Sequence, residues 1–249
     1  TVTARDAVNN TGTGVLTVTY TPVTSGLVAA YSFDENSGTA AGDVSGNGNI
    51  ANFFGGTTWV PGHSGSGLYF EGADDYGTAP TVPYLPNWTV SVWVRSSAAP
   101  SGGSFYSGPI HHDANFQIDW NHTSPSYQGA AGVNVAGTWY PASFGSLAAN
   151  TWYFLAATYD GETLNAYANG SLVTSNAAPS GPASSDPNPL TFGKHSALNY
   201  FFQGIIDDVR VYNRALSPSE IQSDMNTPVS GTSSGGALSF APAVSLPSG

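Results

Sequence analysis

Residues 152–170 read WYFLAATYDGETLNAYANG, which combines two strand patterns with two turn dipeptides. Asp160-Gly161 separates the two apolar-rich runs, and Asn169-Gly170 ends the second. Both dipeptides are strong hairpin markers because Asp, Asn and Gly tolerate the positive φ angles of tight turns. The stretch therefore predicts antiparallel strands joined by short turns.

Similar strand signals recur through the rest of the chain and are separated by turn residues. The predicted strands are 27–33, 67–70, 88–94, 116–120, 132–135, 152–159, 164–168, 190–192 and 204–212. One helical turn is predicted after Leu216, where Ser217 and Glu220 form a capping-box pattern around Pro218. Many short strands without a helical layer predict an all-β, two-sheet antiparallel sandwich.

Charge and composition exclude several classes of protein. The 249 residues include 16 acidic and 5 basic side chains, which gives a formal net charge of −11. Nucleic-acid binding requires clustered Lys and Arg, so this class is excluded. No run of about 18 apolar residues occurs, so we predict no membrane insertion. The absence of cysteine says little about the compartment, but few lysines and abundant Ser, Thr, Asn and Gly are typical of a secreted or cell-surface bacterial module.

The sequence divides into three predicted parts. Residues 1–25 contain a β-hairpin around Asn9 and Asn10, followed by a linker. Residues 26–227 form the strand-rich main domain, and 228–249 form a Gly/Ser/Pro-rich tail. A lone hairpin is marginally stable, so we expect it to dock on the main domain or on a neighbouring copy.

Seven segments in order resemble the laminin G-like type of the concanavalin A-like jelly roll over residues 27–222. They are LVAAYSFDE at 27–35, DVSGNGN at 43–49, GLYFEG at 67–72, WTVSVWV at 88–94, WYFLAATYDG at 152–161, YANG at 167–170 and GIIDDVRVYNRAL at 204–216. Residues 1–20 resemble the last strands of a bacterial immunoglobulin-like repeat. The jelly-roll resemblance implies two stacked antiparallel sheets, with the strand near Tyr31 beside the strand near Val209.

The resemblance also implies a structural Ca²⁺ site where the loop after the first strand approaches the last strand. Its expected ligands are Asp43, Asn47, Asn49 and Asp207. Their side-chain oxygens suit Ca²⁺. Adjacent strand residues face opposite sides, so only one of Asp207 and Asp208 can reach a shared ion, and the resemblance favours Asp207. The alternative is that Asp43 and Asn47 form Asx-turns while Asp207 or Asp208 pairs with a nearby arginine.

We predict that the chain is not an enzyme and has no catalytic residues. Glycosidases need two carboxyl groups at a defined separation, and none of the four glutamates has an acidic partner at i+2 or i+4 on a predicted strand. A transition-metal site is conceivable around His111, His112 and Asp113, with Asp119, His122 and His195. We favour solvated loop histidines instead, because adjacent histidines on an extended chain point to opposite faces.

Aromatic and polar residues that suit a sugar ligand occur together between residues 105 and 140 and near 195–201. Sugars stack on aromatic faces and hydrogen-bond to polar side chains. The candidate ligand-binding residues are Tyr106, His112, Asp119, Trp120, His122, Tyr127, Trp139, Tyr140, His195, Asn199 and Tyr200. We expect Trp93, Phe116, Trp152 and Phe192 to be core residues instead.

These patterns predict a non-catalytic, lectin-like module that binds a polysaccharide or glycan and belongs to a secreted or cell-surface protein. The alternative is a structural or adhesive subunit of an extracellular assembly, in which residues 1–20 mediate self-association by supplying strands to a neighbouring copy.

Overall fold

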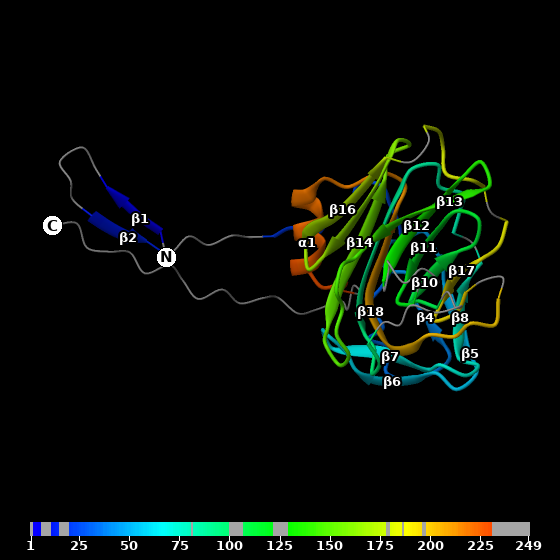
Figure 1. Ribbon diagram of the computed structural model, residues 1–249. Coiled ribbons are helices and arrows are strands. Elements are labelled where there is room, and N and C mark those ends of the chain that lie inside the picture. Colours follow the sequence, from blue (N-terminus) through cyan, green and yellow to red (C-terminus); the bar gives the residue numbers. More distant parts are fainter. Residues whose placement is uncertain are drawn as a thin grey trace.

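The structure is a computed structural model, and it describes residues 20–80, 82–99, 107–121, 129–177, 180–185, 187–195 and 198–230, together with the backbone of 2–5 and 11–14. Two antiparallel sheets face each other in the main domain (Figure 1). The predicted all-β sandwich is confirmed. The predicted ligand-binding residues Tyr106, His122 and Tyr127 and most of the C-terminal tail lie outside the described residues.

Sheet I has eight strands. In spatial order they are β13 (Thr138–Ser143), β12 (Ala130–Val135), β11 (Phe116–Asp119), β10 (Ile110–His112), β17 (Leu190–Phe192), β8 (Tyr76–Ala79), β5 (Ala51–Phe54) and β4 (Ala40–Ala41). Its central strands are fully buried, whereas β5 alternates between buried and exposed positions. Such alternation places one face of a sheet against a core and the other toward solvent.

Sheet II packs against sheet I. Its order is β16 (Ser171–Ala177), β15 (Thr163–Ala168), β14 (Tyr153–Tyr159), β9 (Trp88–Arg95), β18 (Gln203–Tyr212), β7 (Ser66–Glu71) and β6 (Thr58–Pro61), and β3 (Leu27–Tyr31) also pairs with β18. Tyr31 stands opposite Val209 in that pairing, as the resemblance implied. The turn between β14 and β15 contains Gly161 at φ 98°, and Asp160 Oδ1 accepts hydrogen bonds from the Glu162 and Thr163 amides.

All nine predicted strands are present with ends within two residues of the predicted ones. Seven further strands of the two sheets were not predicted: β4, β5, β6, β8, β10, β13 and β16. Several of these are only two to four residues long, and β6 and β13 each contain a proline. Short strands and strand prolines weaken the sequence signal because it depends on sustained alternation.

The main core lies between the two sheets and is rich in aromatic rings. Phe192 packs edge-on to Tyr31 and Phe33 with centroid distances of 5.1 and 6.0 Å. Phe116 packs 4.9 Å from Trp88, so the core positions predicted for Phe116 and Phe192 are confirmed. Edge-on and offset ring pairs add to the stability that area burial provides.

A second apolar cluster lies on the other side of sheet II, under helix α1 (Pro218–Asn226). Figure 1 shows α1 beside β14 and β16. Trp93 packs against this cluster. The His63 ring stacks on the Trp93 ring with their centroids 3.4 Å apart. Trp93 is half-buried and packs against this second cluster instead of the main core. Trp152 is half-buried and belongs to neither cluster, so the prediction that it is a core residue is wrong.

Helix α1 has nine residues, which is longer than the single turn predicted. The predicted capping box is present: the Ser217 hydroxyl accepts from the Glu220 amide, and the Glu220 carboxylate accepts from the Ser217 amide at 2.8 Å. Arg214 also donates to Glu220, at 2.6 Å. The cap satisfies amides that the first helical turn leaves without partners.

The N-terminal hairpin is present as β1 (Val2–Arg5) paired antiparallel with β2 (Thr11–Gly14). Among the described strands, these two form a separate sheet and extend neither sheet I nor sheet II. The predicted linker makes specific contacts with the main domain, because Tyr212 donates to the Val23 carbonyl at 3.2 Å and Arg214 to the Ser25 carbonyl at 2.9 Å. No helix among the described residues is long and apolar enough to cross a membrane.

Candidate functional site

The outer face of sheet I carries a row of polar side chains. Ile110, Phe116, Ile118 and Phe192 point into the main core. Side chains alternate along a strand, so the residues between them point the opposite way. These are His111 on β10, Gln117 and Asp119 on β11 and Thr191 on β17, and the register places His111 opposite both Gln117 and Thr191.

The polar side chains on this face contact one another. Gln117 Nε2 donates to Asp119 Oδ2 at 2.7 Å, and His111 Nε2 lies 3.1 Å from Asp119 Oδ1. The exposed fractions of Asp119, His111 and Gln117 are 0%, 1% and 6%. A buried polar group is costly without partners, so these contacts fix the side chains in a defined arrangement. We call Gln117, Asp119 and His111 the polar centre.

His195 joins the polar centre from the segment after β17. Its ring centroid lies 4.9 Å from that of His111. Burial lowers the pKa of His195 to about 4, with a further lowering from His111 that Asp119 and Asp113 oppose. His195 is therefore neutral at pH 7 and can both donate and accept hydrogen bonds.

Small residues on β12 make room for the polar centre. Gly132 stands opposite Gln117, and Ala130 stands opposite Asp119. A Cβ atom at Gly132 would lie only 2.9 Å from Gln117 Cγ, so a larger residue there would displace the glutamine. The glycine at this position therefore fixes the location of the Gln117 amide.

Aromatic side chains flank the polar centre on both sides. Trp139 on β13 is 38% exposed and stands opposite Asn134. On the other side, Phe54 of β5 stacks on Tyr76 of β8 at 4.9 Å and is 46% exposed. Lys194 Nζ lies 4.9 Å from the Tyr76 ring. The outer face of sheet I thus combines a polar middle with aromatic surfaces toward its edges.

The structure turns two predicted ligand-binding residues inward. His112 is 0% exposed, and its ring packs 5.3 Å from Phe116 while Nε2 lies 3.1 Å from the Asn188 carbonyl. Burial lowers the pKa of His112 to about 4. Trp120 is 1% exposed and donates to the Ala98 carbonyl. Both side chains point away from the outer face of sheet I.

The expectation that His111 and His112 are solvated loop residues is also wrong, because both are buried strand residues. They do face opposite sides, as strand geometry requires. Of the remaining predicted residues, Asp119, Trp139 and His195 belong to the outer face, and Tyr140 packs half-buried against the main core. Asn199 is exposed and Tyr200 half-buried in the loop after His195.

Sequence reasoning considered His111 only for a transition-metal site that it disfavoured, and it did not identify Gln117, Thr191, Phe54, Tyr76 or Lys194. The alternation of Ile110, Phe116 and Ile118 with polar residues could have placed His111 and Gln117 on the same face as the predicted Asp119. Phe54, Tyr76 and Lys194 come from distant segments, and only the strand order brings them to this face.

The loop predicted to bind Ca²⁺ has a dense set of internal hydrogen bonds. Asp43 Oδ1 accepts from the Ala30 and Ser45 amides, and Oδ2 accepts from the Ser45 hydroxyl and the Asn49 amide, all at 2.8–2.9 Å. Asn47 and Asn49 donate their side-chain amides to the Val28 carbonyl. This arrangement supports the alternative in which these residues shape the loop.

Asp207 lies among a different set of partners. Its Oδ2 accepts from the His63 and Ser64 amides at 2.8 and 2.9 Å. Burial raises the pKa of Asp207 to about 8, with a further increase from the adjacent Asp208. Asp208 has φ 47° at an irregularity in β18 and accepts instead from the Val229 amide. Among the described residues, Asp207 therefore shares no hydrogen-bond partner with Asp43.

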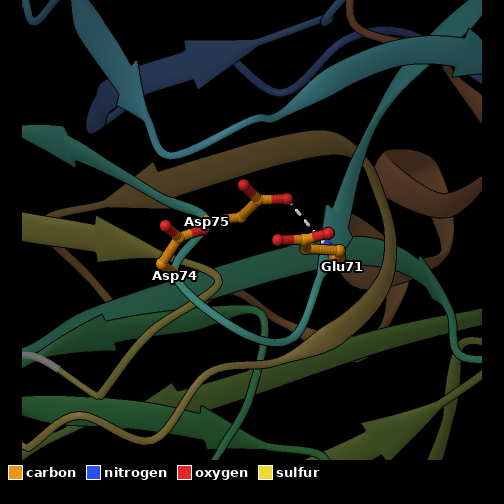
Figure 2. Close-up of side chains that lie close together, drawn as sticks. All are labelled: Glu71, Asp74 and Asp75. Carbon is orange, nitrogen blue, oxygen red and sulfur yellow. Dashed lines mark hydrogen bonds between the residues drawn. The ribbon is translucent and has the colours of Figure 1, made fainter.

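One other acidic group has the spacing that a cation requires. Glu71, Asp74 and Asp75 offer carboxylate oxygens that lie within 4.8 Å of one another. Figure 2 shows these three side chains at the turn between β7 and β8. Asp75 is buried, and its two oxygens accept from the Gly56 and Glu71 amides. Glu71 and Asp74 are exposed. No sequence pattern had indicated a cation site at these three residues.

Comparison with known proteins identifies the family. Residues 71–222 match the laminin G-like profile Laminin_G_3, which is described as the Concanavalin A-like lectin/glucanases superfamily. The chain belongs to this superfamily. The matched region includes β8 to β18 and helix α1 up to Gln222, so it contains the polar centre and Trp139. The immunoglobulin-like resemblance of residues 1–20 lies outside the matched region.

The proteins similar to this chain include a pappalysin, a domain of an arabinanase and a toxin binding domain. Human pappalysin-1 is 25% identical over 199 residues, covering 69% of this chain and 12% of that protein. Domain 4 of AbnA, an extracellular arabinanase from Geobacillus stearothermophilus solved with arabinotriose, has a TM-score of 0.63 at 21% identity, covering 80% of this chain and 98% of that one. The binding domain of Paraclostridial Mosquitocidal Protein 1 has a TM-score of 0.65 at 16% identity, covering 82% and 52%. At these identities the solved structures show the shared fold alone.

Proposed function

We propose that this superfamily member is a non-catalytic carbohydrate-binding module whose ligand lies on the outer face of sheet I. The observation that supports this most strongly is the exposed Trp139 and the Phe54–Tyr76 stack on the same sheet face as the buried polar centre. Sugar C–H faces pack on aromatic rings while hydroxyl groups exchange hydrogen bonds with amide, carboxylate and imidazole groups. Both kinds of partner occur on this one face.

The class of ligand is supported by the solved relatives. AbnA domain 4 carries an arabinotriose, and the second relative is a toxin binding domain. An arabino-oligosaccharide is therefore a reasonable first probe within a broader glycan panel. The secreted or cell-surface location and the boundaries of the main domain at 26–227 belong to the same proposal.

The absence of catalysis is part of the proposal because the superfamily also includes glucanases. A glycoside hydrolase needs two carboxyl groups about 5–9.5 Å apart across the scissile bond. Within the described part of the outer face, the Asp119 carboxylate is held by Gln117 and lies against His111, with no second carboxylate in the polar centre. This arrangement favours recognition of hydroxyl groups over general acid catalysis.

A glycan panel with three proteins tests the proposal. Wild type is expected to retain a defined class of glycan, and Trp139→Ala is expected to lose about 1–2 kcal/mol of binding free energy because one stacking surface is removed. Leu172→Ala is the matched control, since Leu172 is also an exposed large apolar residue but lies on β16 of sheet II. A wild type that retains no glycan would contradict the proposal, as would equal losses in both variants.

A second candidate function is supported by the N-terminal hairpin. Among the described strands, β1 and β2 pair only with each other, so both have an edge that can accept a further strand. In this proposal the chain is a structural or adhesive subunit, residues 1–20 resemble the end of an immunoglobulin-like repeat, and they join neighbouring copies. Light scattering with and without residues 1–22 tests it: concentration-dependent oligomers that need the hairpin support it, and a monomer in both cases excludes it.

Calcium remains a proposed structural ion with two candidate places. The first is the Asp43 loop with Asn47, Asn49 and Asp207, and the second is Glu71 with Asp74 and Asp75. A ligand that binds only the folded state raises the melting temperature. The melting temperatures of wild type and Glu71→Gln are compared in Ca²⁺ and in EDTA. An increase with Ca²⁺ that Glu71→Gln loses assigns the ion to Glu71, Asp74 and Asp75, and an increase that Glu71→Gln keeps favours the Asp43 loop.

A further inference from the structure

Two buried atoms in the polar centre have an unusual relationship. His111 Nε2 and Asp119 Oδ1 are 3.1 Å apart, which is close enough for an ion pair or a hydrogen bond. Even so, neither atom has a hydrogen-bond partner of acceptable geometry within the described part of the chain. Their residues are 1% and 0% exposed, so water does not replace the missing partner at the surface. Buried polar atoms without a partner are rare because each costs about 1–3 kcal/mol.

A shared metal ion accounts for both the distance and the poor alignment. Zn²⁺ binds imidazole nitrogen at 2.0–2.1 Å and carboxylate oxygen at 2.0–2.2 Å, so two such ligands at a tetrahedral angle lie about 3.3–3.5 Å apart. The observed separation of 3.1 Å is close to this value. In such a pair both lone pairs point at the ion, whereas a hydrogen bond would need a protonated Nε2 whose N–H is directed at the carboxylate oxygen.

The second oxygen and a second histidine complete the environment. Asp119 Oδ2 accepts from Gln117 Nε2 at 2.7 Å, and this bond orients the carboxylate as outer partners of metal ligands do. The ring of His195 lies 4.9 Å from the His111 ring. Among the described residues only Glu71, Asp74 and Asp75 have ligand atoms all within 4.8 Å, so the His195 side chain must rotate toward the pair to complete the site.

We propose that His111, Asp119 and His195 bind a divalent transition-metal ion of the Zn²⁺ class. Two imidazoles and one carboxylate suit Zn²⁺, and three protein ligands leave one of its four tetrahedral positions for another ligand. The proposal does not depend on carbohydrate binding, because the ligand set is complete without a sugar. Ca²⁺ and Mg²⁺ are disfavoured here because they prefer oxygen ligands.

Metal binding to the untagged full chain, stripped with EDTA and dialysed, tests the site directly. Calorimetric titration with Zn²⁺ is expected to show one ion per chain, and Co²⁺ is expected to give the intense visible bands of a tetrahedral site. His195→Ala is expected to weaken Zn²⁺ binding by about 100-fold, since ligand loss costs at least as much as loss of an outer partner. His63→Gln is the control, because His63 stacks on Trp93 beside sheet II.

Each outcome decides the proposal. Saturable binding that is lost in His195→Ala and kept in His63→Gln and Glu71→Gln supports it. No saturable binding by wild type, equal affinity in His195→Ala, or loss only in Glu71→Gln would overturn it. Circular dichroism shows whether His195→Ala folds. If it does not, the imidazole ¹⁵N chemical shifts of wild type are measured during Zn²⁺ addition. The proposal requires the His111 and His195 signals to shift together, and it is rejected if they do not. Glycan binding by wild type in EDTA is measured separately, so the two proposals fail independently.

Discussion

Gln117 and Asp119 are two residues apart on β11, and the Gln117 amide donates to the Asp119 carboxylate at 2.7 Å. Residues two apart on a strand share a face, so this bond is local to one strand and needs no loop to form. The pair nevertheless depends on β12, because Gly132 opposite Gln117 leaves space for the amide. The polar centre is therefore determined by strand register as well as by its own residues.

Gly132→Ala tests this dependence. The added Cβ would lie 2.9 Å from Gln117 Cγ, so the glutamine must move and its bond to Asp119 must weaken. We expect a loss of about 1–3 kcal/mol in the free energy of unfolding, as for other overpacked positions, together with weaker glycan binding. Urea unfolding and glycan titration measure the two effects.

Gly42→Ala is the control for this change, because the nearest atom to a Cβ there is Glu35 Oε1 at an ordinary 3.8 Å. It is expected to leave both stability and glycan binding nearly unchanged. Equal behaviour of the two alanine variants would show that Gln117 does not need the space at Gly132.

Glu220→Gln tests the helix cap and its pH dependence. The hydrogen bond from Arg214 lowers the pKa of Glu220 to about 2, with further lowering from Ser217. A carboxyl group whose folded pKa is depressed contributes stability above its unfolded pKa of about 4.3, and the contribution is lost as pH falls toward 2. We expect Glu220→Gln to be about 1 kcal/mol less stable at pH 7, given that the pair is partly exposed.

The difference between wild type and Glu220→Gln is expected to shrink in chemical unfolding as pH falls from 4.5 to 2. A difference that stays constant over this range would mean that the cap acts through its neutral hydrogen bonds alone. Ser219→Ala provides a reference on the same exposed turn, because the Ser219 hydroxyl lies 3.1 Å from the Ser217 hydroxyl and is not part of the Glu220–Arg214 pair.

Asp43→Ala separates the two interpretations of the loop after β3. Four donors bond to the Asp43 carboxylate, so its loss is expected to cost about 2–4 kcal/mol. If the residue shapes the loop, the loss is the same in EDTA and in Ca²⁺. If Ca²⁺ stabilises wild type but does not stabilise Asp43→Ala, Asp43 is instead established as a calcium ligand. Thermal unfolding in both buffers measures this.

The sequence predicted the architecture well because its strongest signals are local. Asp160-Gly161, the capping box at Ser217 and Glu220, and the buried runs of β9, β14 and β18 each depend on neighbouring residues. The pairing of Tyr31 with Val209 came from the family resemblance, since no local pattern specifies which distant strands are neighbours.

The site was harder to predict because it depends on which face of each strand is turned outward. His111 and His112 are adjacent and chemically identical, yet one belongs to the polar centre and the other packs on Phe116. Choosing His112 was an error of strand phase by one residue, which exchanges the two faces. Phe54 and Tyr76 reach this face through the order of sheet I, which no sequence pattern in the chain revealed.

The central claim is that the outer face of sheet I binds carbohydrate. The most direct measurement is amide and side-chain chemical-shift mapping of the ¹⁵N-labelled full chain during titration with the best glycan from the panel. The account predicts saturable shifts of the Gln117 side-chain amide, the Trp139 indole N–H and the Thr191 amide, with Leu172 on sheet II unchanged. Shifts confined to sheet II, or no saturable shift with any glycan, would contradict it.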